Sequence, residues 1–184
     1  MAKIGLNNFK YSLLTEAQDG TPSYAGVKSL GKAIDCKVSV EKYEAELYAD
    51  DGLAESDYTF KKASVTLTID EDDDTVFAEL LGHSVDEETG EMVRKDTDVA
   101  PYVGVGRILT KIVNGVYKYK VEFLAKVKFS EPEQEETTKG DSIEFKTPSI
   151  EGTATKLSDG TWSKSKTFTS KEEAVAYLDS LMAK

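Results

Sequence analysis

The densest group of side chains that could bind a cation is the acidic run Asp70-Glu71-Asp72-Asp73-Asp74. A calcium-binding EF-hand loop places carboxylates at alternate positions and also needs a glycine and a bidentate glutamate further along the loop. Thr75 and Leu81 hold those two positions here, so the calcium motif fails. We interpret the run as a solvated acidic turn leading into a helix, because negative charge is favourable at a helix N-terminus.

Nucleophilic and metal chemistry have few candidate residues. His83 is the only histidine and Cys36 the only cysteine, so a Ser-His-Asp set, a Cys-His set or a zinc site would have no spare members. We expect His83 to be a helix-end residue after Gly82, and Cys36 to be a small core residue. Counting alone leaves a glycosidase-type carboxylate pair open, but no apolar neighbourhood marks an acid with a raised pKa.

Two further signals bear on ligand binding. Gly104-Val105-Gly106 begins like a phosphate-binding loop, but Leu109 replaces the third glycine and a strand pattern continues, so we expect glycines within a strand. Trp162 is either a sugar-stacking platform or the anchor of an edge strand, and the second interpretation is favoured. The sequence therefore predicts a protein that is not an enzyme and that has no cofactor and no metal.

Composition sets the class of protein. The 184 residues are 39% hydrophobic, enough for one folded domain spanning 1–184. The net charge of −11 disfavours a nucleic-acid-binding protein of the usual kind. A single cysteine excludes an intramolecular disulfide, and neither a signal peptide nor a long apolar run is present, so we expect no membrane association.

Strands should position most of these residues. Apolar side chains occupy every second position from Tyr117 to Phe129, and Asn114-Gly115 before them suits a type I′ turn from a strand at 103–112. The alternate positions carry lysines 118, 120, 126 and 128, a basic stripe that is either solvated or docks a neighbouring subunit of complementary charge. Further strand patterns lie at 9–14, 34–41, 44–48, 64–69, 150–156 and 162–168.

Helix is scarce in the sequence. We expect a short helix at Thr75–Leu81, and a second at Lys171–Met182 where Ser170 and Glu173 form a capping box. The apolar stripe of the second helix should dock on a sheet. The predicted fold is mainly β, an antiparallel two-layer β-sandwich or partial barrel with a flanking helix in the C-terminal region.

One segment resembles a known family. Leu47-Tyr48-Ala49-Asp50-Asp51-Gly52-Leu53-Ala54-Glu55 is similar to a segment of the phage major tail proteins, the phi13-like tail-tube subunits of long-tailed phages. Further similar blocks keep their order along nearly the whole chain. These blocks are 2–9, 79–83, 99–103, 117–129 and 145–148.

The resemblance implies a tail-tube fold whose copies form hexameric rings with a shared β-barrel. The rings would stack into a tube around a tape-measure protein, between tail terminator and distal tail proteins, and double-stranded DNA would later pass through the lumen without specific binding. It also implies assembly in the cytoplasm of the bacterial host and a final location in the tail of the virion. An extended loop at about 48–60 would contact the next ring, through Tyr48, Asp50, Asp51, Gly52, Leu53 and Glu55.

A second class of function stays open from the residues alone. The same pattern of strands suits a monomeric Ig-like or carbohydrate-binding β-sandwich module. The two classes differ in self-association, because only the tail-tube subunit must assemble with copies of itself.

Overall fold

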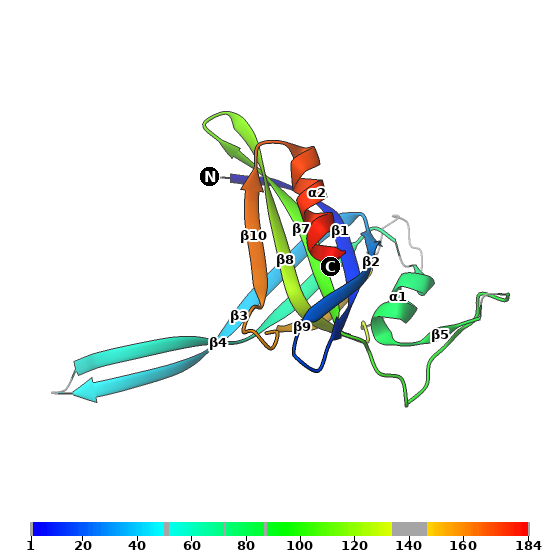
Figure 1. Ribbon diagram of the computed structural model, residues 1–184, viewed down its shortest axis with the longest axis horizontal. Helices are drawn as coiled ribbons and strands as arrows, with labels where there is room; N and C mark the ends of the chain where they lie inside the picture. The colour runs from blue at the N-terminus through cyan, green and yellow to red at the C-terminus, as the bar shows by residue number, and fades with distance from the viewer. Residues whose placement is uncertain (1, 50–51, 72, 87, 134–146, 184) are drawn as a thin grey trace, which may run out of the picture.

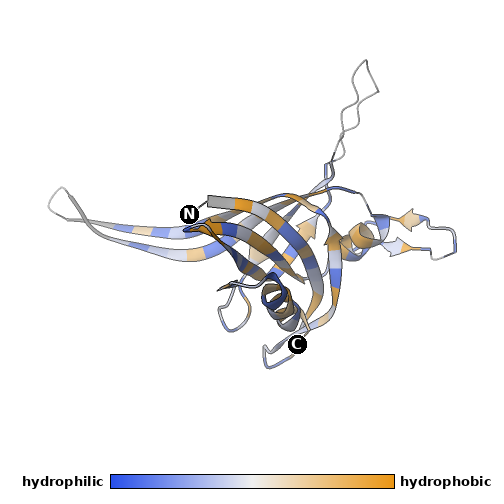
Figure 2. Cartoon of the chain, turned by 90° about the horizontal axis from the view of Figure 1, so that it is seen from above, coloured by the Kyte–Doolittle hydropathy of each residue, from blue (hydrophilic) through white to orange (hydrophobic). Residues whose placement is uncertain are grey.

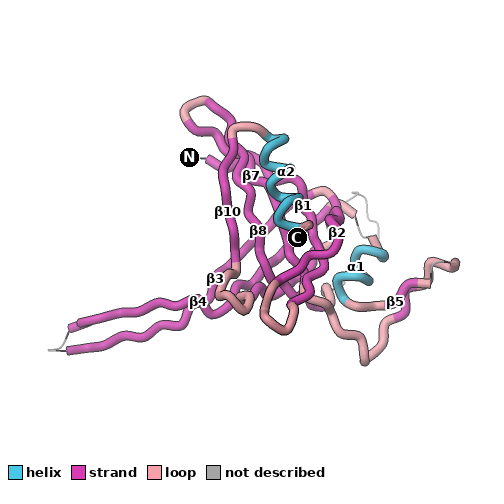
Figure 3. Tube along the Cα trace, in the orientation of Figure 1, coloured by secondary structure: helices cyan, strands magenta, loops and turns pink. Residues whose placement is uncertain are grey.

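The computed structural model describes residues 2–49, 52–71, 73–86, 88–133 and 147–183. Strands make up most of the chain, with one helix beside the sheet and a shorter one at its end (Figure 1, Figure 3). In chain order the elements are β1 (Ala2–Glu16), β2 (Pro22–Gly31), β3 (Ala33–Ala49), β4 (Gly52–Ile69), α1 (Asp74–Leu81), β5 (Ser84–Val85), β6 (Met92–Val93), β7 (Val103–Val113), β8 (Val116–Ser130), β9 (Ser149–Thr155), β10 (Ser163–Phe168) and α2 (Lys171–Met182). The prediction of a mainly β fold with a helix in the C-terminal region is confirmed.

Eight strands form one antiparallel sheet that curls into a partial barrel. Their order is β2, β1, β7, β8, β9, β4 and β3, and β10 also pairs with β8. β8 has two partners along the same side, because residues 119–124 pair with β10 and residues 126–130 pair with β9. β3 returns to lie near β1, but the two strands do not pair within the described residues, so the barrel stays open between them.

Two hydrophobic cores lie on opposite faces of this sheet. The inner core fills the partial barrel and includes Phe9, Leu67, Val105 and, from α1, Leu80. The outer core lies between the sheet and α2, the helix that Figure 2 shows against the outside of the sheet. Burying one such side chain contributes about 1.5–3 kcal/mol, so α2 adds substantially to the stability of the sheet it covers.

β8 contributes to both cores because it contains a bulge. Val103 pairs with Val127 whereas Val105 pairs with Leu124, so β8 holds one residue more than β7 over this stretch. The extra residue shifts the alternation of side chains from one face to the other. Phe123 therefore lies in the outer core, whereas Val127 lies in the inner core.

The sequence predicted a single apolar face for β8, and that prediction is wrong. Leu124 is buried in the inner core although it occupies a position of the expected polar face. The bulge also divides the predicted basic stripe, because Lys118 and Lys120 precede it and Lys126 and Lys128 follow it on the other face. Lys126 and Lys128 both lie over the ring of Tyr102.

Both predicted helices are present, although α1 begins at Asp74, one residue before the predicted start, and Glu172 rather than Glu173 bonds the Ser170 side chain through its carboxylate. Asp73 caps α1, its side chain accepting hydrogen bonds from the backbone N–H groups of Thr75 and Val76, and Gly82 ends the helix at φ +80°. Ser170 caps α2 by accepting from the Glu173 N–H at 3.4 Å, and its hydroxyl donates to Glu172. The apolar stripe of α2 is buried in the outer core, as expected.

Several elements are longer or more numerous than the sequence indicated. Asn114 and Gly115 have φ values of +51° and +79°, as a type I′ turn requires, which confirms the β7–β8 hairpin. β1 extends on both sides of the predicted strand 9–14, with a register shift around Asn8 at φ +54°. Sequence patterns missed β2, whose exposed residues do not alternate cleanly, and the two-residue strands β5 and β6.

Two glycines of β7 allow close packing on its outer face. A Cβ on Gly106 would lie 2.3 Å from Leu178 Cδ1 of α2, and one on Gly104 would lie 2.7 Å from Phe123 and Tyr24. The expectation of glycines within a strand is confirmed. Their small size, rather than a phosphate-binding turn, explains their presence.

Gly106→Val tests this packing. The added side chain would force α2 away from β7, and overpacking of this kind costs about 1–3 kcal/mol. We expect the free energy of unfolding in urea to fall by that amount, whereas Gly90→Ala, where no atom lies within 4 Å of the added Cβ, should cost less through its positive φ alone. Equal losses in the two variants would contradict close packing at Gly106.

Candidate functional site: the β3–β4 arm

The outer half of the β3–β4 hairpin projects from the body of the protein (Figure 1). β3 and β4 pair continuously from Ala33↔Ile69 to Ala49↔Gly52. β4 also pairs with β9, but only through residues 63–68. Residues 42–49 and 52–60, which we name the arm, therefore pair only with each other among the described residues.

A bulge marks the base of the arm. Glu41 pairs with Lys62 and Lys42 pairs with Phe60, so Lys61 is an extra residue of β4. Such a bulge increases the local twist and bends the strand. The Glu41 carboxylate lies 3.4 Å from Lys62 Nζ and 3.7 Å from Lys61 Nζ.

An aromatic stack anchors the same place. The rings of Phe60 and Trp162 are 4.7 Å apart and nearly parallel, at 11°. Both residues pack against the inner core, so the interpretation of Trp162 as an anchor is supported. Phe60 covers one face of the indole, the surface that a sugar ring would need.

Beyond its base the described part of the arm has both faces in water. The described side chains at 42–46 and 56–59 are all exposed, including Tyr43 at 61% and Tyr58 at 51%. Lys61 lies over the ring of Tyr43 and Lys42 over that of Tyr58, each at 5.7 Å. A two-stranded ribbon is marginally stable by itself in water, so the exposed tyrosines favour a partner that covers the arm.

The arm is also strongly acidic. From residue 42 to residue 60 the sequence has one basic residue, Lys42, and six acidic residues, for a net charge of −5. The acidic residues are Glu44, Glu46, Asp50, Asp51, Glu55 and Asp57. Any surface that covers the arm should therefore carry positive charge.

The predicted stacking residues fall at the tip of the arm. Tyr48 pairs with Leu53, Gly52 with Ala49 and Glu55 with Leu47, whereas Asp50 and Asp51 lie outside the described residues. The expectation of an extended loop at about 48–60 needs correction, because the strands continue to Ala49 and resume at Gly52. The β-prone run Tyr58-Thr59-Phe60 is the sequence signal for this continuation.

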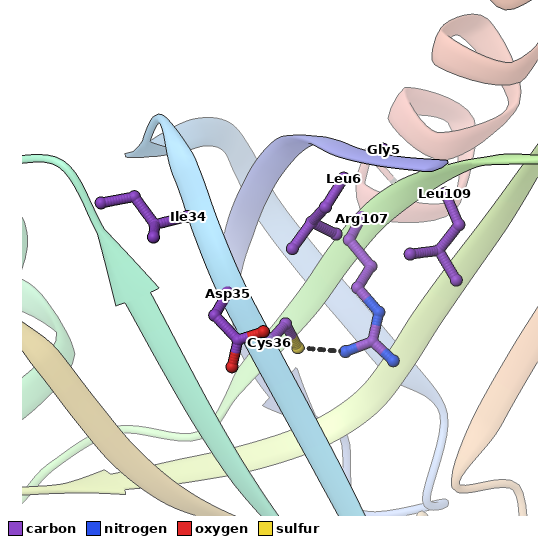
Figure 4. A pocket seen from close by; sticks show the side chains of 7 residues that line it. All are labelled: Gly5, Leu6, Ile34, Asp35, Cys36, Arg107 and Leu109. Atoms are coloured by element: carbon purple, nitrogen blue, oxygen red, sulfur yellow. Dashed lines mark hydrogen bonds between the residues drawn. The ribbon is translucent and has the colours of Figure 1, made fainter. Parts of the chain in front are cut away.

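A small cluster near the open side of the barrel escaped the sequence patterns. Arg107 Nη2 lies 2.6 Å from Glu122 Oε2, and Lys120 Nζ lies 2.6 Å from the other oxygen of the same carboxylate. Arg107 also donates to the Cys36 sulfur (Figure 4). Arg107 and Cys36 line a cavity of about 330 Å³ with Gly5, Leu6, Ile34, Asp35 and Leu109.

This cluster is organised for stability rather than for reaction. Burial raises the pKa of the Cys36 thiol despite the nearby Arg107, which keeps the sulfur protonated and a poor nucleophile. Burial alone would raise the pKa of Glu122, but the hydrogen bonds and charges of Lys120 and Arg107 lower it below its ordinary value. Glu122 therefore stays ionised between two cations.

His83 joins three parts of the chain after α1. Its side chain is 4% exposed, and its Nδ1 lies 2.8 Å from Asp98 Oδ2. Nε2 lies 2.5 Å from a Glu131 oxygen but makes no hydrogen bond among the described residues. The hydrogen bond from His83 lowers the pKa of Asp98. Within the described residues its neighbours are carboxylates, which suits a structural link and not a nucleophile–base pair.

Metal binding and membrane insertion find no support in the residues described. No group of three or more His, Cys, Asp or Glu side chains there is arranged to hold a metal ion. No helix of the described chain is long and apolar enough to cross a membrane.

Comparison with known proteins identifies no relative. No protein-family model matches the chain, and no curated protein sequence matches it.

Glu122→Gln tests the ion cluster. Removing the carboxylate leaves the mostly buried Arg107 without a counter-charge, which should cost about 2 kcal/mol in the free energy of unfolding at pH 7. Because folding lowers the pKa of Glu122, its contribution is present above the ordinary value of 4.5 and is lost as the pH falls through the folded-state pKa.

Urea titrations at several pH values give the measurement. The difference between wild type and Glu122→Gln should be largest near neutral pH and should shrink below pH 4.5. Glu133→Gln, a change of the same type at an exposed residue, is the control. A difference that does not depend on pH would contradict the charged cluster.

Proposed function

We propose that this chain is the structural subunit of a phage tail tube. Copies assemble into hexameric rings, and the rings stack into a tube around a tape-measure protein, with tail terminator and distal tail proteins at its ends. The tube is built in the cytoplasm of the bacterial host and belongs to the virion. Double-stranded DNA passes through its lumen without specific binding.

The arm is the observation that carries this proposal. It extends from a folded body and exposes aromatic residues on a ribbon with little stability of its own, and among its described side chains Phe60 alone packs against a core. A second copy of the chain is a partner that every assembled subunit would have. Contact with the next ring would give the exposed ribbon a stabilising partner and a role in assembly.

The open sheet supports the same function. β2 and β3 end the order of strands, and β10 has β8 as its one partner among the described residues. Open edges promote uncontrolled pairing with other chains, and assembly into rings covers them. Lysines at 164 and 166 protect the edge strand β10 until it is covered.

The charge of the chain suits a DNA conduit. A net charge of −11 offers little surface to which phosphates could bind. Repulsion acts over a Debye length of about 8 Å at physiological salt, so acidic groups at the wall of a narrow lumen would keep DNA from adhering. The proposed subunit needs no enzymatic activity.

Replacing the arm tests the proposal. Residues 43–59 can be exchanged for Asn-Gly, because Lys42 and Phe60 are directly paired and a two-residue type I′ turn joins such a pair. We expect the free energy of unfolding to change by less than about 1 kcal/mol, since the removed side chains that the structure describes, at 43–46 and 56–59, lie outside both cores. Concentrated wild-type protein should form tubes that are visible by electron microscopy. The variant without the arm should form none.

Two outcomes would contradict this proposal, and the first would favour a monomeric binding module instead. Wild-type protein that remains monomeric at every concentration and salt would contradict the tail-tube function and favour a binding domain. Tubes formed equally well without the arm would show that assembly uses other surfaces.

A further inference from the structure

Lysines hold adjacent positions across three strands near the β7–β8 turn. Lys3 of β1 is in register with Lys111 of β7, and Lys111 is in register with Lys118 of β8. We name these three positions the lysine row. Like charges that face each other across a sheet are destabilising, and neither Lys111 nor Lys118 has an anionic partner in the described part of the chain. Lys111 and Lys118 therefore lack a counter-charge among the described side chains.

The surroundings of the row make it more cationic. On the same face, Lys120 lies two residues beyond Lys118 and Arg107 lies four residues from Lys111, and both already share the single carboxylate of Glu122. Glu122 therefore cannot neutralise Lys118 as well. Two large apolar side chains lie exposed at the same end of the sheet, Ile4 next to Lys3 in the chain and Val116 on the same face of β8 as Lys118. The surface thus combines positive charge with apolar area, as protein interfaces do.

The arm carries a matching surface. Glu44 and Glu46 lie on one face of β3, about 7 Å apart along the strand. Tyr58 is paired with Glu44 and Ser56 with Glu46, so an exposed aromatic ring lies beside the two carboxylates on that face. Facing residues on paired strands are about 5 Å apart, so Lys111 and Lys118 present two cations at a similar spacing.

The arm is far from the row of its own chain. In Figure 1 the arm leaves the lower end of the body and points away from it, whereas the β7–β8 turn forms the upper end. Contact between the two surfaces therefore requires two copies. The contact is head-to-tail, because each copy offers its arm to one neighbour and its row to another, and such contacts build rings or open stacks.

We propose that the lysine row is the receptor for the arm of another copy of this chain. Glu44 and Glu46 of the arm face Lys111 and Lys118 of the neighbour, while Tyr58 packs on the exposed apolar side chains beside the row. The inference rests on the proposed function and specifies which surface the arm contacts. Complementary charge fixes the register of the contact and discourages unrelated partners.

Charge reversal of the row is the first test. We expect Lys111→Glu with Lys118→Glu to raise the protein concentration needed for assembly by about tenfold or more, because close interfacial charge pairs have strong coupling. Lys156→Glu with Lys171→Glu is the control, because it makes the same change in net charge at two exposed residues away from the row. Lys156 follows β9 and Lys171 begins α2. This control variant should assemble as wild type does. Circular dichroism and urea unfolding of each variant establish that it folds.

Combining variants identifies the partner surface. Glu44→Lys with Glu46→Lys should prevent assembly when present alone, and should restore it when combined in one chain with Lys111→Glu and Lys118→Glu. A one-to-one mixture of the arm variant and the row variant should also assemble, with the two kinds of chain alternating. The reversed arm of one kind meets the reversed row of the other, and the two unchanged surfaces are complementary as well. Analytical ultracentrifugation distinguishes these products.

The outcomes separate this inference from the proposed function. If wild type forms tubes and the row variant forms them at the same concentration, the row is not the receptor, although the tail-tube function stands. If the chain that carries all four charge reversals does not assemble, the arm and the lysine row do not contact each other. Wild type that never assembles would contradict both. Loss of DNA binding by the row variant, with assembly unchanged, would assign the row to a nucleic acid and overturn the proposal.

Discussion

The bulge in β8 is the constraint on which the rest of the structure depends. Before it, β8 packs its apolar side chains under α2 and pairs with β10, and after it the strand faces the inside of the barrel and pairs with β9. β9 in turn pairs with β4, the strand that continues into the arm. Without the change of face, one row of side chains could not fill two cores, and β4 would have no fixed place beside the barrel.

The body and the arm are stabilised in different ways. Buried apolar side chains and the Arg107–Glu122 pair hold the body together. The arm is fixed only at its base, by the Lys61 bulge and the stack of Phe60 on Trp162. In the described part of its outer half, the two strands pair with each other and no side chain joins either core, so a partner would contribute to the free energy of ordering the arm. In the proposed tube, the neighbouring subunit would be that partner.

Sequence periodicity predicted the strands that bury one face and missed the places where the period changes. The alternation from Tyr117 to Phe129 located β8, and Leu124 among the charged residues was the one sign that its face changes. The sequence Asp50-Asp51-Gly52 indicated where β3 ends and β4 begins, but a run of exposed polar residues looks the same in a loop and in a projecting ribbon. The cluster of Cys36, Arg107 and Glu122 could not be predicted, because these residues are far apart in the sequence. The lysine row depends on the register of β1, β7 and β8, which no local sequence pattern specifies.

Hydrogen exchange of the arm tests the central claim most directly. Backbone amides at 42–46 and 56–60 should exchange rapidly in dilute monomer, because they can open without disturbing either core. In assembled protein the same amides should become protected, with little change at the centre of β8, which is protected in both states. Arm amides that exchange equally fast in the monomer and the assembly would show that no copy covers the arm, and would contradict the account.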